Sequence, residues 1–311
     1  MPLSQDPSVN ETAGALVKTL QGAFGTPAGY PHAKGRLTKG TFTPTSEAAS
    51  LSTAPHFNNA STPVLVRFSN STGIHAIPDT DANANPRGMA TRFLLSEDGH
   101  KHTDIVCHST AFFPTRTGEG FLQMLGALGS GTIGEFLEKN PSAKAFVEDP
   151  KPAPESFATE KYFSVTAFKL IDKSGKERFV RYRITPDAGF STLSDSNLAA
   201  KSKDFLFEEL QERLAKGPAS FKLLVQVAEE GDVTNDNTKH WPEDRKQVQL
   251  GTIKVESIEE EAQSKKEQKR IIFDPIPRVE GVDVSDDPLL DMRAAVYLIS
   301  GRERRAASST A

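Results

Sequence analysis

The chain has 311 residues, of which 37% are hydrophobic and 25% charged, and its formal net charge is −4. This is the composition of a soluble globular protein with its own core, and 37 basic against 41 acidic residues argues against a nucleic-acid partner. No apolar run reaches about 18 residues and no N-terminal signal is visible, so we expect no membrane span and a cytoplasmic protein, and a single cysteine excludes an internal disulfide.

Residues 1–25 are polar and predict an N-terminal arm with one short helix near residues 15–20. From residue 62 onward, short apolar runs separated by turn residues predict β-strands. The predicted strands are residues 64–68, 89–95, 103–108, 163–171, 179–185, 221–227 and 247–256. Turn residues 97–99 and 172–175 are expected to close two hairpins.

Helical stretches fall between and after these strands. Residues 118–128 and 204–216 carry apolar side chains at helical spacing. Residues 257–269 run from acidic to basic, as the helix dipole favours, and predict a solvated helix or a mobile loop. Asp287 and Pro288 provide a cap and a first-turn proline for a last helix from residue 289. Hairpins with helices grouped around them predict a largely antiparallel barrel or sandwich of the α+β class.

Two patterns in the sequence do not indicate a binding site. Residues 129–134 fit the G-x-G-x-x-G pattern of dinucleotide sites, but they follow a helical stretch. Because that motif must follow a strand and open a helix, we expect a loop here. The seven histidines show no tight ligand spacing, so no zinc site is expected.

The last helix carries a more specific pair. Arg293 and Tyr297 stand at i and i+4 and therefore share a helix face. A cation beside a tyrosine hydroxyl favours the phenolate, which is a strong oxygen ligand for ferric iron. Taken alone, an incidental pair on a half-buried helix is still the better interpretation.

Short motifs follow one another in a fixed order between residues 30 and 305. They are PHAKG (31–35), GTFTPT (40–45), VRFS (66–69), PDTDANANPRGMATRF (78–93), DIV (104–106), FF (112–113), YFSVTAFKLIDKSGKERFVRYRI (162–184), FLFEELQERLAKG (205–217), LLVQV (223–227), TKHWPEDRKQVQLG (238–251), IIFDP (271–275), SDDPLLDMRAAVY (285–297) and RER (302–304). Each motif is weak by itself. In this order they make the chain resemble the catalase superfamily, and more closely its short catalase-related peroxidases, the mini-catalases.

The resemblance implies a haem b cofactor and a role for particular residues. Tyr297 matches the phenolate ligand of the iron, and Arg293 matches the arginine that keeps this tyrosine deprotonated. His32 matches the distal acid–base histidine, and Ser69 matches the serine that orients its ring. The remaining matches are to arginines that pair with the haem propionates and to phenylalanines of the haem pocket: Arg67, Arg304, Phe113 and Phe121.

Three departures from the family pattern matter. The distal asparagine before the Phe-Phe pair is absent and the stretch is one residue shorter, so either His108 or Ser109 fills its place. Gly29 stands where a propionate arginine is expected, and Gly301 replaces a histidine of the ligand segment. The chain also ends soon after these positions.

The resemblance therefore implies a single catalase-like haem domain over residues 1–311. It is expected to be an antiparallel β-barrel with surrounding helices, without the C-terminal helical domain of full catalases. Residues 1–25 are its arm, residues 257–269 its charged helix or loop, and residues 289–304 its proximal haem-ligand helix.

The implied function is a haem-dependent peroxidase or catalase, active in oxidative-stress defence, that reduces hydrogen peroxide or organic hydroperoxides through a ferryl intermediate. Two alternatives stay open: an isomerase or dehydratase of fatty-acid hydroperoxides, and a non-catalytic haem carrier or sensor. His32 and Ser69 together argue against the carrier, because haem binding alone needs neither. Expected partners are a small-molecule peroxide and an electron donor, with no nucleic acid and no membrane, and a homodimer is expected because the long arms of full catalases are missing.

Overall fold

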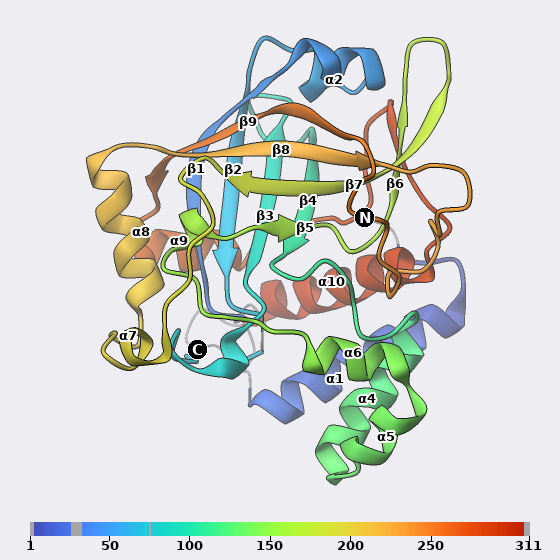
Figure 1. Cartoon of the computed structure of the whole chain (residues 1–311), viewed down its shortest axis with the longest axis vertical. Helices are drawn as coiled ribbons and strands as arrows, with labels where there is room; N and C mark the ends of the chain where they lie inside the picture. The colour runs from blue at the N-terminus through green and yellow to red at the C-terminus, as the bar shows by residue number, and fades with distance from the viewer. Residues whose placement is uncertain (1–2, 26–32, 72, 75, 308–311) are drawn as a thin grey trace.

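An eight-stranded antiparallel β-barrel forms the centre of the computed structural model, which describes residues 3–25, 33–71, 73–74 and 76–307 (Figure 1). The barrel closes because β7 pairs with both β5 and β8. In order around the barrel, its strands are β5 (Tyr162–Phe163), β4 (His102–His108), β3 (Gly88–Leu94), β2 (Thr62–Ser69), β1 (Gly35–Pro44), β9 (Gln247–Ile258), β8 (Ala219–Val227) and β7 (Glu177–Pro186). Two further strands, β6 (Phe168–Ile171) and β10 (Val282–Val284), extend the sheet beyond β7. The structure confirms the predicted barrel.

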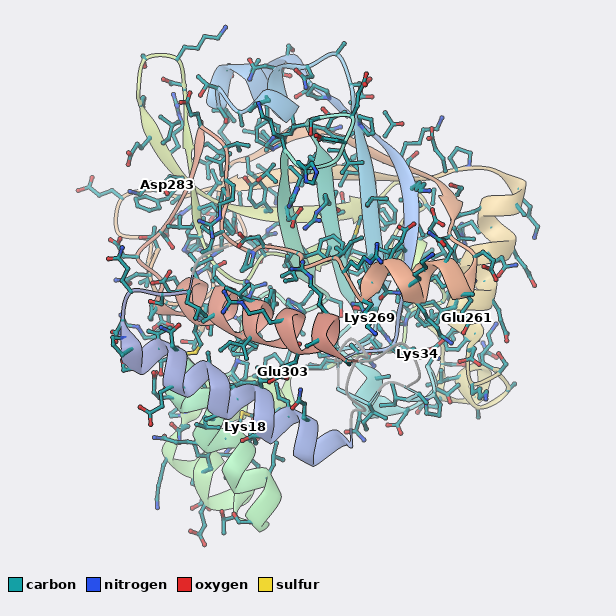
Figure 2. The ribbon with its side chains drawn as sticks, turned by 180° about the vertical axis from the view of Figure 1, so that it is seen from behind. Lys18, Lys34, Glu261, Lys269, Asp283 and Glu303 are labelled. Atoms are coloured by element: carbon teal, nitrogen blue, oxygen red, sulfur yellow. The ribbon has the colours of Figure 1, made fainter. Side chains whose placement is uncertain are left out.

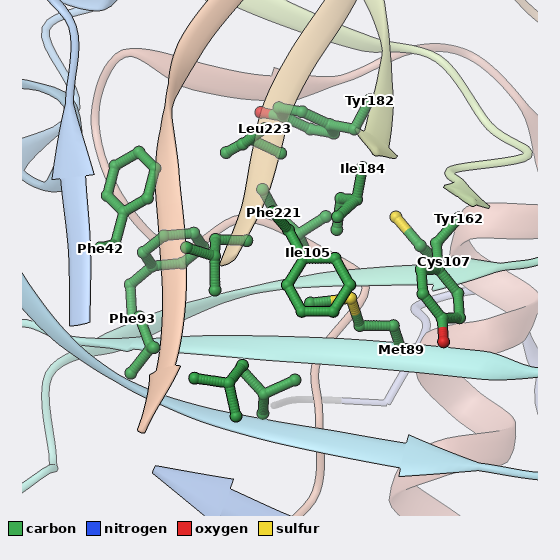
Figure 3. Packing of buried hydrophobic residues seen from close by; sticks show 14 of the residues in the cluster. Phe42, Met89, Phe93, Ile105, Cys107, Tyr162, Tyr182, Ile184, Phe221 and Leu223 are labelled. Carbon is green, nitrogen blue, oxygen red and sulfur yellow. The ribbon is translucent and has the colours of Figure 1, made fainter. Parts of the chain in front are cut away.

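Large apolar side chains fill the barrel interior. Figure 3 shows Phe93, Tyr162 and Phe221 in this core, with Cys107 beside them. On β2 the alternate residues Val64, Val66 and Phe68 are buried in the same core. Because successive side chains of a strand point to opposite faces, these core residues determine which of their neighbours face outward.

Helices surround the barrel. Their bounds are α1 (Pro7–Phe24), α2 (Ser46–Leu51), α3 (Pro55–Asn58), α4 (Gly118–Ser130), α5 (Ile133–Lys139), α6 (Pro141–Glu148), α7 (Asp195–Ala199), α8 (Phe205–Lys216), α9 (Glu261–Gln268) and α10 (Pro288–Ala306), with short 3₁₀ turns at Ala82–Ala84 and Phe157–Thr159. Helix α10 lies outside the barrel with α1 beside it (Figure 2). None of the helices in the described part of the chain is long and apolar enough to cross a bilayer.

The N-terminal helix is longer than predicted. Helix α1 has 18 residues, and Asp6 caps it by accepting a hydrogen bond from the Ser8 amide at 2.8 Å. Ala13 and Leu16 are buried against α10. The prediction missed this length because the buried residues of α1 lie only in its middle, at positions 13, 16 and 17, so the ends of the helix carry no apolar stripe in the sequence.

The glycine-rich segment 129–134 joins two helices. Helix α4 continues to Ser130, and Gly131 ends it with a left-handed φ of 75°, a conformation that favours glycine. Helix α5, which the sequence did not predict, begins at Ile133. The segment therefore lacks the preceding strand that a dinucleotide site requires.

Candidate active site

Helix α10 brings Arg293 and Tyr297 together. Asp287 caps this helix by accepting a hydrogen bond from the Leu289 amide at 2.9 Å, as the Asp287–Pro288 pair predicts. One turn on, Arg293 is buried, and its Nη2 lies 3.5 Å from the half-buried Tyr297 hydroxyl. The guanidinium carbon is 5.8 Å from the centre of the tyrosine ring. The helix thus holds a cation against a phenol.

Three strand ends meet in one row on the outside of the barrel. Ser69 of β2 pairs with Gly88 of β3, and Gly88 pairs with His108 of β4. The neighbouring residues Phe68, Met89 and Cys107 face the core, so the row itself faces outward. Residues opposite each other in a ladder lie on the same face, and the row places the Ser69 and His108 side chains on either side of a glycine.

Gly88 leaves space in this row. A Cβ at its position would lie 2.7 Å from Ser69 Oγ, and the two atoms would clash at that distance. One row further along, Arg67 pairs with Ala90. The outward face of β3 therefore carries two small residues, Gly88 and Ala90, beside the polar side chains of β2.

His108 is a neutral imidazole at neutral pH. Burial, and next the positive charge of Arg293, lower the pKa of its half-buried ring to about 3. Cys107 faces the other way, and burial raises the pKa of its thiol to about 12 although Arg293 opposes this. The influence of Arg293 on both residues places this part of α10 near the end of β4.

Ser109 has a different position. It follows the end of β4, and its hydroxyl accepts a hydrogen bond from the Arg87 amide at 2.8 Å. Its own amide donates to the Arg87 carbonyl at 2.8 Å. Ser109 thus joins the ends of two strands, and it is His108 that shares the row with Ser69.

Arg67 and Arg304 lie close together on the same side of the barrel. Burial and then the charge of Arg304 lower the pKa of Arg67 to about 10, while Tyr297 opposes this shift. Burial, and then Arg305, lower the pKa of Arg304 to about 10 as well. Arg304 Nη2 donates to the Ile271 carbonyl at 2.9 Å, but its buried Nε has no partner among the described residues. Arg67 is thus within electrostatic range of Arg304 and of Tyr297, which contacts Arg293, and we call these four residues the cluster.

The cluster lacks a negative charge. Among the residues that the structure describes, no carboxylate forms an ion pair with Arg67, Arg293 or Arg304. Cations held partly out of water without a counter-charge are costly, so the arrangement favours an anion beside them. A haem fits this requirement, because it has two carboxylates for Arg67 and Arg304 and an iron that an ionised Tyr297 would ligate.

Phe113 contacts Phe121, and Phe121 packs against α10. Their ring centres are 5.0 Å apart. Phe121 comes from α4, which packs tightly on α10: a Cβ at Gly118 would lie 2.4 Å from Met292 Cγ. Phe121 joins the apolar cluster that α1, α4 and α10 share.

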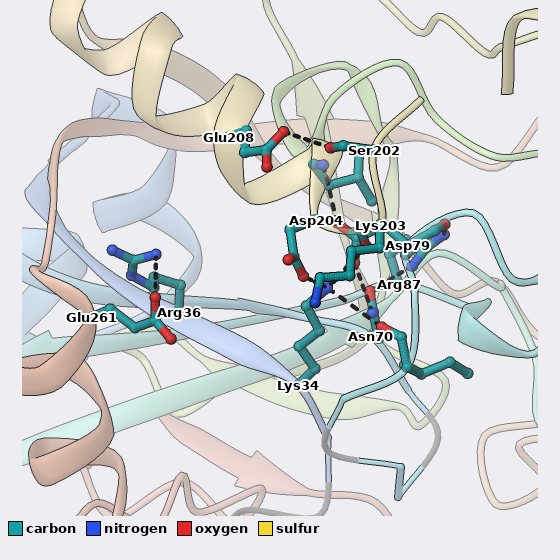
Figure 4. Close-up of polar contacts among 12 residues, drawn as sticks. Lys34, Arg36, Asn70, Asp79, Arg87, Ser202, Lys203, Asp204, Glu208 and Glu261 are labelled. Carbon is teal, nitrogen blue, oxygen red and sulfur yellow. Dashed lines mark hydrogen bonds and ion pairs between the residues drawn. The ribbon is translucent and has the colours of Figure 1, made fainter. Parts of the chain in front are cut away.

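His32 lies outside the described residues, but the chain just after it is firmly held. Lys34 Nζ lies 2.8 Å from Asp79 Oδ1 and 2.6 Å from Asp204 Oδ1 (Figure 4). Asp79 is fully buried and also accepts hydrogen bonds from Asn70 Nδ2 and the Leu206 amide, both at 3.0 Å. The sequence pattern does not predict this network, although Lys34 and Asp79 stand inside the motifs that begin with PHAKG and PDTD.

A second ion pair supports the end of α10. Arg92 holds Asp104 in a two-point contact at 2.9 and 2.7 Å, and Asp104 Oδ2 accepts a hydrogen bond from the Asp274 amide at 2.7 Å. This fixes the loop that carries Ile272. The end of the Ile272 side chain packs directly on Gly301, because a Cβ at Gly301 would lie 2.3 Å from Ile272 Cδ1.

Comparison with known proteins assigns the family. The family model described as Catalase matches residues 26–310. A catalase-related peroxidase of Mycolicibacterium paratuberculosis is 34% identical, with 94% of this chain and 95% of that protein aligned. A second protein of this name, from Synechococcus elongatus, is 31% identical over 94% and 88% of the two chains. These matches confirm the predicted catalase-related peroxidase branch.

Solved structures support the same fold. A crystal structure of a fungal catalase aligns with a TM-score of 0.78 and 23% identity, over 94% of this chain and 63% of that one. Catalase A from Saccharomyces cerevisiae aligns with a TM-score of 0.78 and 22% identity, over 93% and 64%. The chain thus spans less than two thirds of the length of these two structures. The expectation of a peroxide-acting oxidoreductase is confirmed at the level of the family, and the chain belongs to the catalase family.

Proposed function

We propose that this chain is a haem b peroxidase that reduces hydrogen peroxide or organic hydroperoxides at the expense of an organic electron donor. Membership of the haem-dependent catalase family and relatives named catalase-related peroxidase support this proposal. When bound, the haem iron supplies the two-electron oxidation and reduction chemistry on peroxide. The protein residues bind the cofactor, orient the peroxide and move its protons.

One observation carries the proposal. Arg293 and Tyr297 share a face of α10, and Arg67 and Arg304 lie close to them without a carboxylate partner among the described residues. An anionic ligand with an iron centre would account both for the Arg293–Tyr297 pair and for the two arginines that lack a carboxylate partner. We therefore assign Tyr297 as the iron ligand, with Arg293 stabilising its phenolate and the other two arginines binding the propionates.

Proton transfer is assigned to His32. With haem and peroxide bound, its imidazole would accept a proton from one peroxide oxygen and return it to the other oxygen as the O–O bond breaks. Ser69 fits the role of orienting this ring, because its hydroxyl lies on the outward row at the end of β2. Transfer of a proton requires a group whose pKa is near the working pH, so the low pKa of His108 makes it a poor base.

His108 is instead assigned to hydrogen bonding. A neutral imidazole donates from one nitrogen and accepts at the other. Its place opposite Ser69, across Gly88, is the support for putting it where catalases have the distal asparagine. An imidazole is bulkier than an amide, and this change should hinder the positioning of a second, small peroxide more than the first proton transfer by His32.

The balance between two reactions tests the proposal. Purified protein should turn over an organic hydroperoxide with an organic donor and release oxygen from hydrogen peroxide only weakly. Steady-state rates of donor oxidation and of oxygen release, measured on the same preparation, decide it. Oxygen release at the rate of full catalases would overturn the peroxidase assignment.

The two alternative functions give different results in this experiment. A fatty-acid hydroperoxide that is consumed without a reductant, and yields a rearranged product, would identify an isomerase. A protein that binds haem but shows no spectral change with any peroxide would be a carrier or sensor. Both outcomes would contradict the proposal.

A further inference from the structure

Helix α9 buries an unusual pair of side chains. Of its eight residues only Ser264 and Gln268 are buried, at 0% and 4% exposure. They stand at i and i+4 and so share the face turned to the barrel. A surface helix normally buries an apolar stripe. Since the buried face of α9 is polar, hydrogen bonds must hold this helix against the barrel.

These hydrogen bonds hold Gln268 in one orientation. Ser264 Oγ accepts from the Leu37 amide at 2.9 Å and from Gln268 Nε2 at 2.9 Å. Gln268 Nε2 also donates to the Gly35 carbonyl at 3.1 Å. With its nitrogen used in this way, Gln268 turns its oxygen toward β2.

There Gln268 Oε1 accepts a hydrogen bond from Arg67 Nε at 2.6 Å. Arg67 Nη2 donates to the Ala33 carbonyl at 2.6 Å, and the guanidinium lies over Gly35, where a Cβ would be 2.5 Å from Nη2. The orientation of the guanidinium plane is therefore determined by α9, the chain around residue 33 and a glycine.

The acceptor on Arg67 is a neutral amide. A carboxylate at position 268 would also accept from Nε, but it would neutralise the charge of the arginine. With the amide, the positive charges of Arg67 and Arg304 stay uncompensated by the described residues. A neutral acceptor thus satisfies a donor and preserves the attraction for an external anion.

We propose that Gln268 is a positioning residue that orients Arg67 and leaves its charge for a carboxylate of the bound haem. This inference rests on the proposed function, because it takes haem as the anion. It adds a residue of α9 to those that determine cofactor affinity.

The test compares haem with its dimethyl ester, in which both carboxylates are blocked. Apo-protein is titrated with each, following the Soret band, for wild type, Gln268→Glu, Gln268→Leu and the control Gln263→Glu, whose residue is exposed on the same helix. Gln268→Glu should weaken haem binding at least about tenfold, because its carboxylate competes for Arg67. Its affinity for the ester and both affinities of Gln263→Glu should stay close to wild type. The apo-protein of Gln268→Glu should lose thermal stability, because a carboxylate cannot donate to the Gly35 carbonyl as the amide does.

Gln268→Leu serves as the second variant. It leaves Arg67 Nε without an acceptor, so it should lower apo-protein stability and weaken haem more than the ester. If Gln268→Glu does not fold, the comparison of haem and ester affinities in Gln268→Leu decides whether the inference holds.

Each contrary outcome has a distinct meaning. Wild-type haem affinity in both Gln268 variants would overturn the role of Gln268 and leave the proposed function standing. An equal loss for haem and ester would assign Gln268 to packing and overturn the inference. A wild-type protein that binds no haem would overturn the proposed function and this inference with it.

Discussion

Tyr297 and Arg293 can be separated by their effects on the haem spectrum. Tyr297→Phe removes the proposed ligand oxygen and should abolish or greatly weaken haem binding. Arg293→Leu keeps the ligand but removes the cation 3.5 Å from it, so haem should stay bound with a Soret band that changes with pH. Tyr182→Phe, whose residue is buried in the core, is the control and should keep the wild-type spectrum. If Tyr297→Phe behaved like this control, the ligand assignment would be wrong.

His32 should matter for rate and not for binding. His32→Ala is expected to bind haem normally and to react with peroxide at least about a hundredfold more slowly, the usual scale for losing a general acid–base group. Stopped-flow measurement of the Soret change after mixing with peroxide gives this rate. His100→Ala, at an exposed turn, provides the comparison. Wild-type kinetics in His32→Ala would place proton transfer at another residue.

His108 should control which reaction dominates. His108→Asn restores the amide of full catalases beside Ser69, so the ratio of oxygen release to donor oxidation should rise several-fold. Ser109→Asn should leave this ratio near wild type, because Ser109 is used to join β3 and β4. The ratio is measured in the steady state with hydrogen peroxide. If this ratio rose only in Ser109→Asn, the position of the distal asparagine would belong to Ser109 and not to His108.

At the residue scale, the sequence predicts local pairs well and distant ones poorly. Arg293 and Tyr297 are one helical turn apart, so spacing alone predicts that they meet. Arg67 and Gln268 are 201 residues apart, and Lys34 and Asp79 are 45 apart. No periodicity connects such partners, because only the folded barrel brings them together.

At the scale of elements, Asp79 joins the end of β2, the chain before β1 and the start of α8. Asp79→Ala would leave Lys34, Asn70 and the Leu206 amide without their buried acceptor, and we expect unfolding free energy to fall by about 3 kcal/mol or more. Denaturant unfolding of the apo-protein measures this. Asp286→Ala, at an exposed position, should change stability by less than about 0.5 kcal/mol. Similar losses in both variants would show that the network is not important for stability.

Element boundaries follow from the sequence where an apolar pattern is strong. The hairpin of β3 and β4 and the helix α8 lie within one or two residues of their predicted ranges. Helices α5 and α6 were missed, and α5 buries no residue completely, so it leaves no clear stripe to detect. Helix α9 forms where the charges allowed a helix or a loop, and its two buried residues are polar.

For the whole molecule, His56 should make stability depend on pH. Burial lowers the pKa of this histidine to about 3, and its ring centre lies 4.0 and 4.6 Å from those of Phe57 and Phe93. Its pKa in the unfolded chain is about 6.5, so below that pH the unfolded state binds the additional proton. The stability present above pH 6.5 is therefore lost as pH falls toward 3.

His56→Leu should remove this loss. Relative to wild type, the variant should gain about 2 kcal/mol between pH 7.5 and pH 5 in the free energy of unfolding. Denaturant unfolding of the apo-protein at several pH values checks this. His100→Leu should keep the wild-type dependence on pH. Parallel curves for wild type and His56→Leu would show that His56 does not titrate on unfolding.

The architecture as a whole was only partly readable from the sequence pattern. Alternating apolar residues and hairpin turns predict a barrel or a sandwich, and only the resemblance to catalases favours the barrel. The pairing of β7 with β8 that closes it joins strands separated by α7 and α8, so no local signal could reveal it.

Alternation on β4 also limits where the length of this chain can change during evolution. Deleting one residue inside the strand would turn the Cys107 thiol outward and press the His108 ring into the apolar core. The resemblance to full catalases implies that the stretch before the Phe-Phe pair is one residue shorter here, and the ladder of β4 is nevertheless intact up to His108. The shortening is therefore accommodated in residues 109–111, after the strand ends, where a loop tolerates a change in length at little cost. Insertions and deletions among relatives should accumulate there and be excluded from the strand itself.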